Sequence, residues 1–257
     1  MRFKWLGTAT LLLEGGGTRL LIDPYCRRYA SLPPLPLEEA RTAEAIFITH
    51  PHLDHFQDAD VFSEGERPVY VSQGGIELAH RNGMQTGCMY AVAPGDVIRV
   101  GGLSVGAFAA RHCRFDAATI SRVLFSPHTW RHAKDAFALL GGACKFRIGR
   151  GDVLAFLVSD GEKSVFVFGS AGMAEGEHYP QGADLLIFPY QGRAHMEREL
   201  LPFLRALRPQ AVVIDHFDDA FPPVSQRVDT GGFLPAVQGN LPSCRAYIPQ
   251  ENIWYEV

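Results

Sequence analysis

Hydrophobic positions in the first half of the chain fall in short runs separated by turn residues, a pattern that predicts β-strands rather than long helices. The runs with this pattern are residues 3–14, 18–25, 44–50, 67–72 and 96–110. Between them the pattern favours only a few helical turns, such as residues 74–82. The LPPLP stretch at 32–36 is interpreted as a rigid surface connection, with a polyproline ligand for a partner domain as the alternative.

After residue 112 the pattern changes. Residues 113–145 are less regular and predict a partly helical insertion, and residues 152–170 then predict a hairpin that turns at Asp160-Gly161. Two further buried strands, at 183–190 and 211–217, flank an amphipathic helix whose four leucines lie near one face. This order predicts one α/β (α+β) domain over the whole chain, residues 1–257, that closes with a βαβ unit.

Composition and charge narrow the classes of function. Apolar residues make up 47% and charged residues 20% of the 257 residues, an ordinary balance for a globular protein with a substantial core. The net charge of −4, without a long Lys/Arg run, disfavours a nucleic-acid partner. No stretch approaches the roughly 20 apolar residues of a membrane span, and the five cysteines show no CxxC spacing, which favours free thiols. A cytoplasmic protein without a membrane partner is therefore expected.

The strongest chemical signal is the segment FITHPHLDHFQD at 47–58, which begins inside a buried run. On an extended segment His50 and His52 point the same way and can converge on one point. If a helix begins at Leu53, Asp54 and His55 turn toward a second point nearby. Two such groups of imidazole and carboxylate predict a dinuclear site for zinc, manganese or iron, with a histidine-rich surface turn as the alternative.

The chain resembles the metallo-β-lactamase superfamily of metal-dependent hydrolases, for which HxHxDH after an apolar strand is the most specific motif. LLIDPY, ARHCRF, FVFGSAGM and IDHFDDAFPP stand where the further motifs of that family are expected. DPY, HPHLDH and the closing HF…FPP resemble most the ascorbate-lactonase-like and N-acylphosphatidylethanolamine-phospholipase-like branch. The resemblance implies a four-layer αββα sandwich, with two sheets face to face, helices outside and the metal site at one edge.

The resemblance also implies the set of metal ligands. The expected ligands are His50, His52 and His112 for one ion and Asp54, His55 and His216 for the other. Asp23, at the end of an early strand, would hydrogen-bond within the loop that presents these ligands and so fix the orientation of a ring.

The chain departs from the family at Ser170, where a metal-bridging aspartate is usual; Asp160 belongs to the hairpin turn and is no substitute. Two divalent ions carry +4 and Asp54 carries −1, so +3 would remain, and a serine hydroxyl cannot bridge two cations as a carboxylate does. We expect one empty or weak site, or an anion that completes the bridge, with a non-catalytic site as the third outcome. Ser170 would then hydrogen-bond the attacking water.

Substrate contacts are expected around the strand end at 183–190. His195 is interpreted as a residue that contacts substrate or donates a proton, with a solvent-facing histidine as the alternative, and Tyr190 as an oxyanion stabiliser. The insertion at 113–145 is interpreted as a lid or a dimer contact. It carries aromatic and cationic side chains, namely Phe115, Phe125, Trp130, Arg114, Arg122 and Arg131. These groups favour a substrate with an acidic group and an apolar part.

The sequence therefore predicts a metal-dependent hydrolase of an ester, lactone, amide or phosphodiester in a small molecule. Zn²⁺ is the expected cofactor, as one or two ions, with Mn²⁺ or Fe²⁺ as alternatives. Zn²⁺ lowers the pKa of water from about 15.7 to about 7, and Asp54 and His195 are the expected catalytic residues. The alternatives are a non-catalytic metal-binding or ligand-sensing protein with a degenerate site and a non-haem di-iron redox protein.

Overall fold

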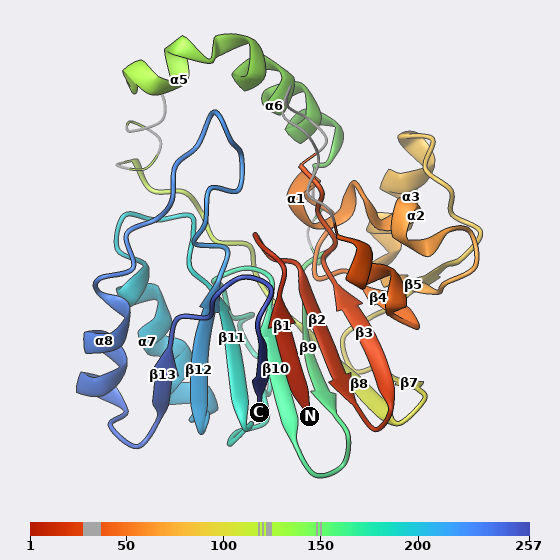
Figure 1. Cartoon of the computed structure of the whole chain (residues 1–257), viewed down its shortest axis with the longest axis vertical. Helices are drawn as coiled ribbons and strands as arrows, with labels where there is room; N and C mark the ends of the chain where they lie inside the picture. The colour runs from red at the N-terminus through yellow and green to blue at the C-terminus, as the bar shows by residue number, and fades with distance from the viewer. Residues whose placement is uncertain (28–36, 118, 120, 122–124, 148, 150) are drawn as a thin grey trace.

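The computed structural model describes residues 1–27, 37–117, 119, 121, 125–147, 149 and 151–257. Two seven-stranded sheets pack face to face, and helices cover the outer side of each sheet (Figure 1). The predicted four-layer αββα sandwich is confirmed. The LPPLP connection and Arg122 lie outside the described residues.

The first sheet has the order β14-β1-β2-β3-β4-β5-β6. Its strands are β1 (Arg2–Trp5), β2 (Leu11–Gly15), β3 (Thr18–Ile22), β4 (Ala45–Phe47), β5 (Val69–Val71), β6 (Met89–Ala91) and β14 (Trp254–Glu256). Neighbours from β14 to β3 are antiparallel, and neighbours from β3 to β6 are parallel. The carboxyl ends of β3 and β4 therefore lie at the same edge.

The second sheet has the order β13-β12-β11-β10-β9-β8-β7. Its strands are β7 (Val97–Val100), β8 (Leu103–Ala109), β9 (Leu154–Ser159), β10 (Ser164–Phe168), β11 (Leu185–Pro189), β12 (Ala211–Asp215) and β13 (Arg245–Tyr247). The strands from β10 to β13 are parallel, and β9 is antiparallel to both β8 and β10. Since β8 and β10 thus run in the same direction, the carboxyl ends of β8, β10, β11 and β12 share one edge.

Eight described helices accompany the sheets. They are the 3-10 helix η1 (Glu38–Thr42) and the α-helices α1 (Leu53–Phe56), α2 (Ala59–Ser63), α3 (Gln73–Arg81), α5 (Pro127–Arg131), α6 (Ala133–Lys145), α7 (Met196–Leu207) and α8 (Phe233–Asn240). Helices α1 to α3 belong to the core on the outer side of the first sheet, and α7 packs on the second. The predicted hairpin at 152–170 is confirmed as β9 and β10, with its turn at Asp160 and Gly161.

The alternation of side chains along the strands builds two cores. In β2, Leu11 and Leu13 belong to the core between the sheets, while Leu12, which points the other way, packs with the helices. The amphipathic helix predicted between the last two buried strands is confirmed as α7. Its Phe203 ring lies 4.9 Å from the rings of both Phe168 and Phe188, so this helix seals the outer face of the second sheet.

Helices α5 and α6 form an arch above the carboxyl ends of the strands (Figure 1), and we refer to residues 127–145 as the arch. None of the residues in its two helices is buried. No described helix is both long enough and apolar enough to cross a membrane. The arch is the part of the predicted insertion that the structure describes most completely.

Candidate metal centre

The six side chains predicted as metal ligands lie together at the shared edge of the sheets. They form two groups, His50, His52 and His112 in the first and Asp54, His55 and His216 in the second. Within each group the ligand atoms lie within 4.8 Å of one another. The ring centroids of His50 and His55 are 4.0 Å apart, so the groups adjoin. A pair of neighbouring metal ions could therefore be held here.

The local fold of the HxHxDH segment explains how it serves both groups. The strand β4 ends at Phe47, and a short segment that bends at Thr49 leads to α1, which begins at Leu53 with His52 as its extended N-cap residue. This is the change from strand to helix predicted from the sequence. All four residues of α1 are buried, and Leu53 and Phe56 anchor the helix in the core beneath it. The remaining two, Asp54 and His55, turn toward the second group of ligands.

A hydrogen-bonded carboxylate fixes the base of this segment. One oxygen of Asp23 accepts from the backbone N–H of Thr49 at 2.7 Å, and the other accepts from the Thr49 hydroxyl at 2.5 Å. The second oxygen also lies 2.7 Å from Nδ1 of His55. That contact directs Nε2 of His55 toward Asp54, 3.8 Å away. Asp23 therefore orients a ligand ring from behind, as the resemblance implied.

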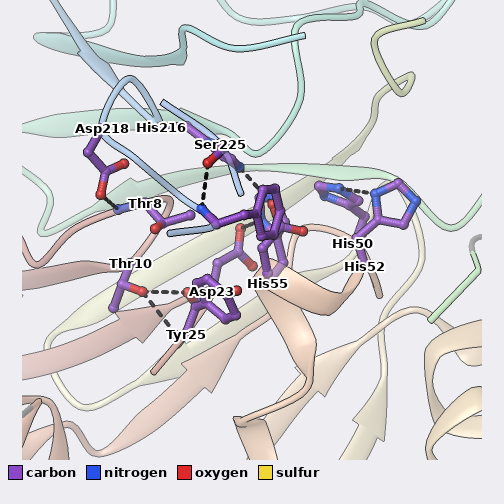
Figure 2. Close-up of polar contacts among 12 residues, drawn as sticks. Thr8, Thr10, Asp23, Tyr25, His50, His52, His55, His216, Asp218 and Ser225 are labelled. Atoms are coloured by element: carbon purple, nitrogen blue, oxygen red, sulfur yellow. Dashed lines mark hydrogen bonds and ion pairs between the residues drawn. The ribbon is translucent and has the colours of Figure 1, made fainter. Parts of the chain in front are cut away.

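The turn between β1 and β2 supports two strained residues at the same edge (Figure 2). Asp23 and His216 both have a positive φ, of 48° and 56°, which is costly for residues other than glycine. The Thr10 hydroxyl donates to the carbonyl of Asp23 at 2.9 Å, and the carbonyl of Thr8 accepts from the backbone N–H of His216 at 2.8 Å. Asp218 in turn accepts from the N–H of Thr8 at 3.0 Å. The turn thus holds one supporting residue and one ligand in their required conformations.

Ser170 lies between two ligand-bearing segments. Its hydroxyl accepts a hydrogen bond of 2.8 Å from the backbone N–H of Cys113, the residue after His112. Glycines on both sides allow this close approach: a Cβ at Gly169 would lie 1.8 Å from the Thr49 hydroxyl, and one at Gly172 would lie 2.3 Å from the carbonyl of Arg111. Ser170 therefore positions the His112 segment, and it also lines the cavity above the ligands.

Burial keeps the first group of histidines neutral. Desolvation, reinforced by the neighbouring imidazoles, lowers the pKa of His50 far below its ordinary value, and desolvation lowers the pKa of His52 to about 4. The pKa of His112 is lowered for the same reason. Near pH 7 these rings are unprotonated, which is the form that binds a metal ion.

In the second group, neighbouring charges outweigh the effect of burial on the pKa values. Burial alone would raise the pKa of Asp54, but His55 and a hydrogen bond of 3.0 Å from Nε2 of His216 hold it well below its ordinary value. Burial opposes the protonation of His55, yet Asp23 and Asp54 raise its pKa to about 8. In the absence of a cation, a proton on His55 thus offsets one of the two negative charges of Asp23 and Asp54. The site is electrostatically suited to positive charge.

The chemistry of these donors fits divalent transition metals. Five imidazoles and one carboxylate make a nitrogen-rich set of intermediate softness, which suits zinc and also manganese or iron. The rings are already close together, since Nε2 of His50 lies 3.1 Å from Nδ1 of His52 (Figure 2). The sequence offers a single carboxylate in the set, so the site carries less negative charge than one with a bridging aspartate.

A cavity of about 470 Å³ opens above the ligands. Besides the six ligand residues and Ser170, its lining consists of Leu53, Cys113, Phe115, Leu139, Ala143, Phe146, Arg147, Gly169, Pro189, Gln191, Gly192 and Phe221. Most of these residues are apolar, and they come from α1, from the arch and the two residues after it, from the end of β11 and from the segments that follow β8, β10, β11 and β12. The candidate metal site is therefore the polar floor of a mainly apolar chamber.

Tyr190 and His195 are not among the residues that line this cavity. Pro189 and Gln191 do line it, so Tyr190 between them points to the other side, where its ring lies 5.9 Å from that of Phe233. Burial raises the pKa of Tyr190 to about 12. His195 caps α7, and its side chain is 62% exposed beside Glu197, with the ring nitrogen 3.1 Å from the carboxylate. The predicted roles of both residues at the reaction centre find no support in these positions.

Of the aromatic residues emphasised in the sequence of the insertion, one contributes to the cavity and two do not. Phe115 lines the cavity, but Phe125 and Trp130 are exposed, at 80% and 66%. The aromatic and aliphatic contacts come instead from Leu139, Ala143 and Phe146 near the end of α6. The cation in the lining is Arg147, two residues beyond the predicted end of the insertion.

Three supporting residues were missed by reasoning from the sequence. Thr49 lies directly before the HxHxDH motif. A hydroxyl residue at this strand end was the feature of the sequence that could have indicated its supporting role. Thr8 and Thr10 lie in a turn about two hundred residues before His216, and nothing in the local pattern links them to the site. Their role follows only from the pairing of β1 with β2 beside the end of β12.

Residues 18–217 match the protein family described as Beta-lactamase superfamily domain. The chain is 26% identical, over 236 residues, to a UPF0173 metal-dependent hydrolase of Thermococcus kodakarensis, with 88% of each chain covered. Igni18, a metallo hydrolase from Ignicoccus hospitalis, is similar in structure with a TM-score of 0.61 and 18% identity, over 100% of this chain and 98% of that chain. CmlA, a diiron β-hydroxylase from Streptomyces venezuelae, has a TM-score of 0.61 and 14% identity, over 99% of this chain and 53% of that chain.

The chain belongs to the β-lactamase superfamily. The predicted superfamily and fold are confirmed, and the predicted class of enzyme, a metal-dependent hydrolase, is confirmed at the level at which the sequence relatives are named. The two structural likenesses, both below 25% identity, show the fold alone. The assignment to a branch of the superfamily and the choice of zinc stay predictions.

Proposed function

We propose that the protein hydrolyses an ester, lactone, amide or phosphodiester bond in a small molecule, with Zn²⁺ as its metal. The observation that carries this proposal is the pair of ligand groups, each within 4.8 Å, at the floor of a cavity of about 470 Å³. A cavity of this size is large enough for a small-molecule substrate.

The chain's own residues divide the work. His50, His52 and His112 would hold one cation, and Asp54, His55 and His216 the other. When bound, a divalent cation lowers the pKa of water from about 15.7 to about 7 and polarises the oxygen under attack. Asp54 orients the attacking water and accepts its proton, because its carboxylate remains ionised beside His55 and His216. The apolar lining excludes competing water from the same chamber.

Ser170 determines how many cations the site holds. With a serine here, Asp54 is the one carboxylate among the six ligands, so two divalent ions leave a charge of +3. An anionic group of the substrate would then lower this charge. The other arrangement consistent with the proposal is a single cation, held by one of the two ligand groups.

The test is the metal content per chain, measured by elemental analysis on protein purified without added metal, for the unmodified protein, Ser170→Asp and Ser170→Ala. We expect one or two equivalents in the unmodified protein, two in Ser170→Asp, and no gain in Ser170→Ala. In parallel, p-nitrophenyl acetate, γ-butyrolactone and bis(p-nitrophenyl) phosphate test hydrolysis before and after chelation. At least one should be hydrolysed in a metal-dependent manner, and absence of metal from all three proteins would refute the proposal.

The same departure at Ser170 favours one second candidate, a metal-binding or ligand-sensing protein without catalysis. This candidate predicts bound metal but no hydrolysis of the three substrate classes, in the unmodified protein and in Ser170→Asp alike. The two candidates therefore differ in activity and not in metal content.

A further inference from the structure

The cavity above the metal ligands carries groups that metal binding does not use. Its walls are apolar on two sides, formed by Leu53 of α1 and by Leu139, Ala143 and Phe146 of the arch and its C-terminal end. Phe146 is buried against Phe56, with ring centroids 6.3 Å apart, so this wall is anchored in the core. An apolar molecule entering the chamber would replace water along the whole of this surface.

Arg147 is the cation at the rim of this wall. It follows Phe146 directly and lines the cavity, and within the described part of the chain it forms no ion pair. Two other arginines of neighbouring segments are paired with carboxylates: Arg111 lies 3.1 Å from Glu175, and Arg193 lies 3.3 Å from Glu199. Arg147 therefore offers an uncompensated guanidinium to whatever enters the cavity.

The other charged groups of the cavity lining also favour a bound anion. Among the described residues that line the cavity, Asp54 is the one carboxylate, and it is already engaged by His216 at 3.0 Å. The surrounding segment is basic as well. Residues 111–150 hold eight arginines and lysines against two aspartates, whereas the whole chain has a net charge of −4. A bound anion would meet attraction from both the rim and a loaded metal site.

We propose that this cavity binds an amphipathic anion, a molecule with a bulky apolar part and one carboxylate or phosphate group, and that Arg147 is the residue that selects the anionic group. The apolar part lies against Leu53, Leu139 and Phe146, and the anionic group pairs with the guanidinium. That this ligand is the substrate rests on the proposed hydrolase function. The binding preference itself does not.

Three probes test the proposal by isothermal titration calorimetry, and each differs from the next by one feature. 4-Phenylbutyrate has both the apolar part and the carboxylate, 4-phenyl-1-butanol lacks the charge, and butyrate lacks the ring. We expect 4-phenylbutyrate to bind most tightly, by about three- to tenfold over the alcohol, as for a partly exposed charge pair. The measurement is made on metal-free and on zinc-loaded protein, which separates attraction by Arg147 from attraction by the metal.

Two substitutions and a matched control locate the effect. Arg147→Gln should remove most of the preference for the acid over the alcohol in the metal-free protein and leave the affinity for the alcohol unchanged. Arg131→Gln removes an arch cation that does not line the cavity, and it should change neither affinity. Ala143→Trp fills the chamber and should weaken both phenyl probes at least tenfold, with circular dichroism to verify the fold.

The outcomes separate the possibilities. Each of three results would overturn the proposal. The first is equal affinity for the acid and the alcohol in the metal-free protein, and the second is an equal loss of affinity for the acid in Arg147→Gln and Arg131→Gln. The third is unchanged binding of the phenyl probes in Ala143→Trp. The expected pattern without hydrolysis of any test substrate would leave the ligand class standing and refute the hydrolase function. The two failures are therefore distinguishable.

Discussion

The edge that carries the metal ligands and the arch above it are built in opposite ways. The four residues of α1 are all buried, whereas none of the 13 residues of α6 is. Each ligand segment follows a strand end and is tied to the core by hydrogen bonds, as Asp23 and Ser170 show. The arch meets the body through fewer contacts, such as the 3.0 Å hydrogen bond from the Asn82 amide to the carbonyl of Lys145. The proposed chemistry and the proposed selection of ligand thus fall on parts of the molecule with unequal burial.

This contrast resembles a general division between rigid scaffolds and adaptable rims. Of the nine large hydrophobic side chains that are exposed in the described residues, five lie at positions 115, 125, 130, 137 and 140. Substitutions at the ligand edge should therefore affect chemistry or stability strongly. Substitutions in the arch should affect ligand preference with little cost in stability.

The largest effect is expected from Asp54→Asn. This change keeps the size of the side chain but removes the charge that accepts a proton, so kcat should fall by about 10²- to 10⁴-fold. The measurement is steady-state kinetics on a substrate identified by the panel above, with metal content and circular dichroism as controls. Trp130→Ala, in the arch, is the matched comparison and should leave kcat within about twofold. An Asp54→Asn variant with unaltered kcat would remove this residue from the mechanism.

Asp23→Asn should have the next largest effect. Its carboxylate receives three contacts, from the Thr49 N–H, the Thr49 hydroxyl and His55, and an amide can satisfy them only in part. We expect a loss of about 10- to 100-fold in metal affinity, and a decrease of about 1–3 kcal/mol in the free energy of unfolding. Competition with a chromophoric chelator and urea denaturation measure the two. Asp96→Asn, at an exposed turn, is the control that should change neither.

The sequence was sufficient to predict which side chains gather at the ligand-bearing edge. It was insufficient to predict which residues of the arch reach the cavity, and the reason is physical. Ligands such as His50 and His52 follow a buried strand, where the period of two fixes which side chains converge. The insertion buries no helical residue in the described part of the arch, so no periodic apolar face revealed which side meets the cavity. Arg147 could be identified only once the end of α6 was placed beside α1.

One prediction, for Tyr190, found no support, and one residue, Thr8, was missed, and the reasons differ. The orientation of Tyr190 could have been predicted from the sequence, because the alternation of side chains that places Pro189 and Gln191 in the cavity places Tyr190 outside it. The role of Thr8 was not accessible, because its contact with His216 joins positions at opposite ends of the chain. Local patterns do not encode such a pairing; it follows from the arrangement of the sheets.

Thr10→Val tests the hydrogen bonds of the β1–β2 turn with a smaller expected effect. The hydroxyl donates to the carbonyl of Asp23 and accepts from the N–H of Tyr25, both buried contacts. Valine keeps the shape and leaves these groups unsatisfied, so the free energy of unfolding should fall by about 1–3 kcal/mol. The same substitution in the arch, Thr129→Val, should cost less than about 0.5 kcal/mol. Equal losses in the two variants by urea denaturation would erase the contrast between edge and arch.

The smallest effect is expected from Phe137→Ser in α6. The phenyl ring is 70% exposed, so its removal takes little apolar surface from a buried position, and the free energy of unfolding should change by less than about 0.5 kcal/mol. Phe146→Ser, at the buried C-cap residue that follows the same helix, is the matched comparison and should cost about 3–5 kcal/mol, the range for removing a buried phenyl group. Urea denaturation measures both. A loss at Phe137 close to that at Phe146 would mean that the exposed face of the arch is covered in solution, and the arch would then belong to the rigid part of the molecule.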